Sequence, residues 1–157
     1  LIVSDLDSAL VTEARAAAAV QGVDLRVERS SSDRETLYLF RRSAPAIDGL
    51  WLLPDDKAFG PTTLREIIRY AAARDVGVLA FSEALLQHGA LLSATSVPSD
   101  VAASVHVAVE RIAAGRTAQL PMLSPLSAAE LTVNGAVAEA LGLPPRATTR
   151  WMVREPD

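Results

Sequence analysis

The chain has 157 residues, of which half are hydrophobic and only 4% are aromatic, so its core must be built from aliphatic side chains and alanine. That length suits a single domain that buries about two-thirds of the surface exposed by its unfolded form. Its 15 basic and 19 acidic residues give a net charge of −4 with no long basic run, which argues against nucleic acid as a partner. The absence of cysteine excludes disulfides, thiol catalysis and cysteine-bound metals.

The sequence has no apolar run long enough to span a membrane, and its first residues lack the pattern of a signal peptide. It begins with Leu-Ile-Val in place of Met, and these residues already have the character of a core strand. We therefore expect the chain to be part of a longer protein whose targeting information lies upstream.

The first third of the sequence predicts two strand–helix units. Residues 2–3 form an apolar strand end, and the helix after it carries Leu10, Ala14 and Ala17 at helical spacing until Gly22 stops it.

The second unit opens with residues 23–27, which alternate apolar and polar side chains as a half-buried strand does. Ser32 and Glu35 form a capping-box pattern at the start of the next helix. That helix presents an apolar face made of Leu37, Phe40 and Ala44.

Residues 47–53 are almost wholly apolar and end in Pro-Asp-Asp, which predicts a central strand buried on both faces. Leu52 should be nearly inaccessible to solvent. Thr63 and Glu66 form another capping-box pattern, which predicts that a helix starts there, and residues 78–81 form the fourth strand.

The second half continues the alternation. Ser82 can cap a short helix that Gly89 terminates, and residues 90–96 are expected to form a fifth strand. A longer helix over residues 100–114 precedes a strand at residues 131–133. Asn134 caps a last short helix that ends at Gly142.

Strands that alternate with helices predict an α/β fold, a doubly wound parallel sheet of the flavodoxin-like type. We expect one lobe over residues 1–143, with a crossover helix at residues 98–115, and a C-terminal tail over residues 144–157. Trp151 in the tail should either dock on the body or pack against a part that is missing.

Polar side chains follow three of the predicted strands. In a parallel sheet the carboxyl ends of the strands meet helix N-termini at one edge, where polar and anionic ligands bind. The predicted ligand-binding residues at this edge are Ser4, Asp7, Ser8, Asp55, Ser82 and Glu83. With Asp5 and Asp56 nearby, these carboxylates suit an amino-bearing ligand. Helix capping alone accounts for many of the same residues, so only their clustering favours a site.

Two catalytic alternatives fit less well. Asp5 and Asp7 resemble the paired aspartates of haloacid-dehalogenase phosphatases, but the residues after them differ from that family's pattern, and Lys57 is the only lysine available. Asp55 also resembles the acid of a receiver domain, but residues 90–96 contain no matching lysine. No metal or cofactor is predicted, since the two histidines have no third ligand in view.

Several segments in chain order resemble a known family: Gly49-Leu-Trp-Leu-Leu-Pro-Asp55, residues 78–82, Gly89-Ala-Leu-Leu-Ser93, residues 111–115 and 131–134, and Ala140-Leu-Gly-Leu143. They are similar to the solute-binding proteins of ABC transporters of the tryptophan and tyrosine uptake type, which have a type I periplasmic-binding fold. The resemblance covers about nine-tenths of the chain and corresponds to the second lobe only.

This resemblance implies non-catalytic binding of a small solute, such as an amino acid or related amine, outside the cytoplasm or in the periplasm. The implied partners are the missing first lobe and the membrane permease of an ABC uptake transporter. A ligand-sensing or interaction domain of a larger signalling protein is the alternative that the sequence leaves open.

The helix at residues 100–114 raises a separate expectation. It carries Val101, Val105, Ala108 and Ile112 on one side, and such a stripe must be covered. In the resembling family this helix crosses to the first lobe. Without that lobe, we expect it either to fold back onto its own lobe or to exchange between two copies, forming a homodimer through residues 98–115. The long linker over residues 116–127 favours the exchange.

Overall fold

The structure is a computed structural model that describes residues 1–5, 8–55, 57–116 and 128–144, together with the backbone of residues 150–154. Its helices are α1 (Ser8–Val20), α2 (Asp33–Ser43), α3 (Pro61–Ala72), α4 (Pro98–Ala113) and α5 (Gly135–Ala140), with short 3₁₀ helices η1 (Ala44–Ala46) and η2 (Glu83–His88). Its strands are β1 (Ile2–Val3), β2 (Glu28–Arg29), β3 (Gly49–Trp51), β4 (Gly77–Ala80), β5 (Leu92–Ser96), β6 (Ala128–Val133) and β7 (Arg150–Arg154).

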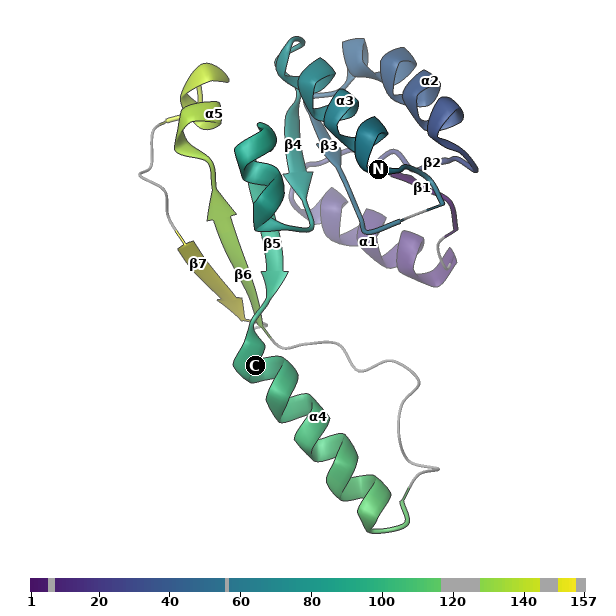
Figure 1. Cartoon of the computed structure of the whole chain (residues 1–157), viewed down its shortest axis with the longest axis vertical. Coiled ribbons are helices and arrows are strands. Elements are labelled where there is room, and N and C mark those ends of the chain that lie inside the picture. The colour runs from purple at the N-terminus through teal and green to yellow at the C-terminus, as the bar shows by residue number, and fades with distance from the viewer. Residues whose placement is uncertain (6–7, 56, 117–127, 145–149, 155–157) are drawn as a thin grey trace.

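The strands confirm an α/β fold dominated by parallel pairing. β1 pairs with β2, and β3, β4 and β5 follow one another, all in parallel. β6 and β7 extend the second sheet with antiparallel pairing, in the order β3-β4-β5-β6-β7 (Figure 1). The sequence did not predict this antiparallel edge, and β7 shows that the tail contributes a strand to the sheet.

The expectation for residues 47–53 is partly wrong. The strand is shorter, and β3 stands at the end of the five-stranded sheet rather than at its centre. The β1–β2 pair meets this end through side-chain hydrogen bonds from Ser4 to Asp55. Two parts of the prediction hold: β3 pairs with β4 in parallel, and Leu52 is only 1% exposed.

The core lies between the sheet and the helices α2 and α3. Phe40 of α2 and Ile67 and Ile68 of α3 are fully buried against Leu52 and Val78. Thr36 is buried in the same region, where its hydroxyl bonds to the Ser30 hydroxyl (2.7 Å) and to a backbone carbonyl of the loop after β3. These contacts connect α2 to the end of β2 and to the loop after β3.

Three predicted caps are confirmed. The Ser32 Oγ accepts from the Glu35 N–H, the Ser82 Oγ caps η2, and the Asn134 Oδ1 caps α5. η2 ends at Gly89, whose φ of 104° lies in the left-handed region that favours glycine.

The capping box at Thr63 is wrong. α3 begins two residues earlier, because Pro61 takes the first helical position after Gly60. Proline suits that position since its missing N–H would have no partner there in any case. Thr63 is therefore inside the helix and buried.

The strand predicted at residues 23–27 is also wrong, because only Glu28–Arg29 joins the ladder. Ile2 pairs with Glu28 and Val3 with Arg29, so the β1–β2 ladder of the described residues does not include residues 23–27. The alternating side chains can form a strand only where a partner strand supplies hydrogen bonds.

Two helices contrast with α2 and α3, because no residue of α1 or α4 is buried. On α1 the half-buried residues are Val11, Ala14 and Ala18. The sequence had predicted Leu10, Ala14 and Ala17, but Leu10 and Ala17 are exposed. α4 projects away from the sheets after β5 (Figure 1). The expected fold-back of this helix onto its own lobe is therefore wrong.

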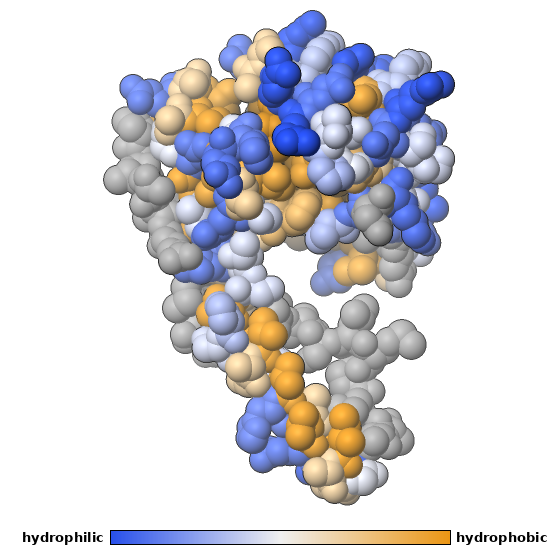
Figure 2. All heavy atoms as spheres, in the orientation of Figure 1, coloured by the Kyte–Doolittle hydropathy of each residue, from blue (hydrophilic) through white to orange (hydrophobic). Residues whose placement is uncertain are grey.

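An apolar band runs along α4 (Figure 2). Val105 is 56% exposed and Ile112 is 52% exposed. The helix thus carries the stripe that the sequence predicts, without a cover in the described part of the chain. Across that same part, no helix combines the length and the apolar character needed to cross a membrane.

Candidate functional site

The candidate site is the edge of the sheets at which the parallel strands end. Ser4 follows β1, Asp55 lies in the loop after β3, and Ser82 and Glu83 follow β4. α1 begins four residues after Ser4 and η2 begins at Glu83, so the N-terminal ends of two helical elements follow these strands.

Asp55 connects the ends of β1 and β3. Its Oδ2 accepts from the Ser4 N–H (2.5 Å), and its Oδ1 accepts from the Ser4 hydroxyl (2.8 Å) and from the backbone N–H groups of Lys57 (3.1 Å) and Ala58 (3.0 Å). Burial raises the pKa of Asp55, but these hydrogen bonds to the charged form outweigh it, so the pKa lies below its ordinary value of 3.8. The carboxylate is therefore anionic at neutral pH and already holds two loops together.

Ser82 and Glu83 form a second polar group at the end of β4. The Ser82 Oγ accepts from the Ala84 N–H at 3.3 Å, which is its capping role. Glu83 is exposed at the surface, where its Oε1 accepts from the Thr132 hydroxyl of β6 at 2.8 Å. Thr132 was not among the predicted site residues, since its strand was expected only from the apolar neighbours on either side of it.

Ser8 is the first residue of α1 and is exposed, and its carbonyl accepts from the Thr12 hydroxyl at 2.8 Å. Asp7 lies outside the described residues. Of the predicted set, the structure joins Ser4 to Asp55 directly and places Ser82 beside Glu83.

Ser4, Asp55 and Ser82 are half-buried at this edge, and Ser8 and Glu83 are exposed. Two hollows on the described part of the chain lie elsewhere, one on α2 and one between α1 and residues 23–28, and none of the predicted site residues lines either of them. A ligand held at this edge alone would remain largely in solvent, whereas small-molecule sites bury most of the ligand surface. The edge therefore has the form of one wall of a site.

The histidines do not gather with other ligating groups. His106 lies on α4, with its Nε2 3.4 Å from the Glu110 carboxylate, and His88 ends η2. Among the described residues, no three His, Asp or Glu side chains are placed to share a metal ion.

The fold is similar to one half of several larger proteins of known structure. No protein-family profile and no curated protein matches the chain. Solved structures do match it, with TM-scores of 0.62–0.65 at 16–18% sequence identity, which establishes likeness of fold alone.

Three of these structures are informative. One is a conserved domain protein from Vibrio cholerae (17% identity, TM-score 0.65), which the chain matches over 92% of its own length and 49% of the other. Another is an ABC domain from Streptococcus pneumonia in complex with L-Trp (18% identity, TM-score 0.64), which the chain matches over 90% of its own length and 48% of the other. The third is the ligand-free, open structure of a substrate-binding protein with adhesive properties from Clostridium difficile (16% identity, TM-score 0.62), which the chain matches over 93% of its own length and 49% of the other. The chain thus spans about half the length of each.

Proposed function

We propose that this chain is the second lobe of an extracytoplasmic solute-binding protein that delivers a small solute to an ABC uptake transporter without chemical change. The likeness of nine-tenths of the chain to half of an L-Trp-bound ABC domain and to half of a substrate-binding protein carries the proposal. The open polar edge supports it, because a two-lobed site needs each lobe to supply one wall.

The solute class follows from the charge at this edge. The Asp55 and Glu83 carboxylates give this edge negative charge, while the N-terminal ends of α1 and η2 supply the positive ends of helix dipoles. An amino acid or related amine carries a cationic group for the carboxylates, and the acid group of an amino acid suits the helix N-termini. We place Ser4, Asp7, Ser8, Asp55, Ser82 and Glu83 at this wall of the site.

Asp55 and Ser4 have a positioning role in this proposal. Since their hydrogen bonds tie the loop after β1 to the loop after β3, they fix the spacing of the wall. Glu83 is more exposed and offers a carboxylate at the surface, so it is the better candidate for direct contact with an amine.

The apolar face of α4 fits a first lobe. α4 leaves the body at the carboxyl end of β5, on the same side as the polar edge, and so extends toward the position of an opposing lobe. Cover by that lobe removes Val105 and Ile112 from water. A homodimer through residues 98–115 is the competing arrangement, and light scattering on the full-length protein distinguishes it from a monomer.

Isothermal titration of the full-length protein tests the solute proposal. The probes are L-tryptophan, the other amino acids, small amines and the deaminated analogue of each amino acid that binds. We expect an amino-bearing solute to bind, Glu83→Gln to weaken it, and the exposed Glu139→Gln on α5 to leave it unchanged. Equal binding of the deaminated analogue would remove the carboxylates from the site, and no binding by any probe would remove the proposed solute class.

A further inference from the structure

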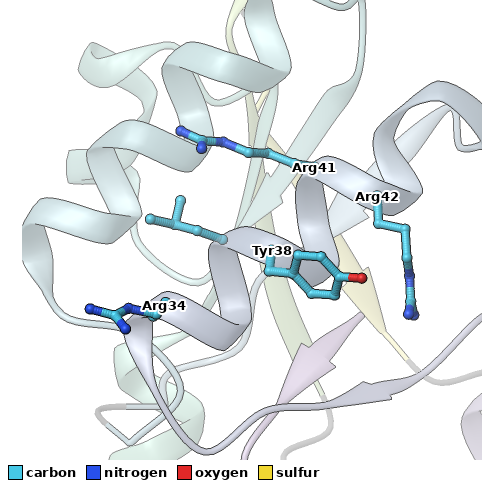
Figure 3. A pocket seen from close by; sticks show the side chains of 5 residues that line it. Arg34, Tyr38, Arg41 and Arg42 are labelled. Carbon is cyan, nitrogen blue, oxygen red and sulfur yellow. The ribbon is translucent and has the colours of Figure 1, made fainter.

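The outer side of α2 carries a group of arginine and tyrosine side chains that the solute edge does not use. Its members recur three and four residues apart, which places them on one side of the helix. They line a shallow hollow, seen in Figure 3, and are Arg34, Leu37, Tyr38, Arg41 and Arg42. We call this set the arginine–tyrosine stripe.

The stripe is basic on a chain of net charge −4, since three guanidinium groups and no carboxylate line the hollow. Arg41 pairs with Glu66 and Arg42 with Glu28, but the side chains of both pairs are about half exposed. Exposed ion pairs contribute little free energy, so either arginine can exchange its partner for another carboxylate at small cost. The Arg34 guanidinium has no ion pair or hydrogen bond within the described residues.

The aromatic members add a second observation. Tyr38 is 63% exposed, with the Arg42 guanidinium 5.8 Å from its ring centre. Tyr70 of α3, outside the stripe, has the guanidinium groups of Arg41 and Arg74 at 5.7 and 5.1 Å from its ring centre. Tyrosine and arginine are the residues that most often dominate protein interfaces, because they offer large contact area together with a polar group.

We propose that the arginine–tyrosine stripe docks a partner protein through an acidic segment in which carboxylates flank an apolar side chain. The carboxylates would pair with Arg34 and its neighbours, and the apolar side chain would pack on Leu37 and Tyr38. A protein is favoured over an anionic membrane, because membrane recognition generally uses clusters of about four to eight basic residues, more than line this hollow. The inference stands apart from solute binding.

A labelled peptide of alternating glutamate and leucine is the probe, with fluorescence anisotropy and hydrogen exchange on the full-length protein as readouts. We expect protection of α2 on binding. Arg34→Glu and Tyr38→Ala should each weaken binding about tenfold or more. The matched control Arg15→Glu makes the same charge change on exposed α1 and should leave binding within about twofold.

Several outcomes overturn the proposal. They are equal binding of a peptide with glutamine in place of glutamate, binding that Arg34→Glu leaves unchanged, and loss of binding on Val105→Ser of α4. Failure of the acidic peptide to bind at all does the same. If the protein binds phosphatidylserine vesicles but not the peptide, and Arg34→Glu abolishes that binding, the stripe binds a membrane surface. If the protein self-associates and Arg34→Glu abolishes the association, the stripe binds a second copy of the chain.

Discussion

The helices α3 and α4 have similar sequence patterns and opposite surroundings. Both start with a proline at the first helical position, and both carry aliphatic residues three and four positions apart. Four residues of α3 are buried, among them Ile67 at 0% exposure, whereas no residue of α4 is buried. An apolar stripe thus predicts that a helix has a face to cover but does not say which element covers it.

The connections explain the difference. α3 joins two neighbouring parallel strands, β3 and β4, so it must lie across the sheet that contains both. α4 joins β5 to an antiparallel strand, β6, which requires only that the chain return, so the helix is free to leave the body. A helix that connects parallel strands must therefore pack on the sheet, whereas a helix that connects antiparallel strands need not.

The largest expected effect tests the covered side of this comparison. Ile67→Ala removes a fully buried side chain between α3 and the sheet and should lower the free energy of unfolding by about 2–5 kcal/mol. Leu52→Ala should act in the same range. Urea denaturation followed by circular dichroism measures both. A loss below about 1 kcal/mol at either position would mean that this core is not packed as described.

A smaller effect tests a polar contact within the same core. Thr36→Val keeps the shape of the side chain but removes a buried hydroxyl that bonds to the Ser30 hydroxyl and to the Ala58 carbonyl. We expect a loss of about 1–3 kcal/mol, because the carbonyl stays buried without its donor. Thr12→Val on exposed α1 removes a hydroxyl that bonds to the Ser8 carbonyl and should cost less than about 0.5 kcal/mol.

The sequence predicted the order of strands and helices well, and for physical reasons. Apolar periodicity and caps are local, so the positions of α2, η2 and α5 follow from Ser32, Ser82 and Asn134. Pairing is not local. The antiparallel edge and the end position of β3 depend on which strands meet, and so does the pairing of β1 with residues 28–29 in place of residues 23–27.

The candidate site shows the same division. The sequence placed Ser4 after the first predicted strand and Asp55 after the third, at one edge of the sheet, and the structure joins them by hydrogen bonds. It could not predict that Asp55 would receive four hydrogen bonds within the chain, nor that Thr132 of β6 would bond to Glu83. Both depend on the conformation of loops and on an antiparallel neighbour, which side-chain patterns do not encode.

The pH dependence of stability tests the contact that ties β1 to the sheet. Hydrogen bonds hold the pKa of Asp55 below 3.8, so its stabilisation is present in full above that pH and is lost as the pH falls through the lowered pKa. Asp55→Asn should cost about 1 kcal/mol at neutral pH and less in acid. Asp24→Asn, an exposed control, should leave the acid limb of the stability curve unchanged. An Asp55→Asn curve parallel to that of the wild type would contradict this assignment.

The smallest effect is expected on α4 and completes the comparison with α3. Ile112→Ala makes the same chemical change as Ile67→Ala, but its side chain is 52% exposed, so in residues 1–157 it should change the free energy of unfolding by less than about 0.5 kcal/mol. If a first lobe covers α4, as we propose, the same substitution in the full-length protein should cost about 2 kcal/mol or more, because three buried carbon atoms and their packing are then lost. Measuring Ile112→Ala in both lengths separates the two surroundings, with the concentration varied to detect exchange between copies. If Ile112→Ala costs about 2 kcal/mol of unfolding free energy in residues 1–157, and this cost grows with protein concentration, a second copy covers the helix. If the cost is equally small in residues 1–157 and in the full-length protein, the face of α4 is exposed in both, which contradicts cover by a first lobe.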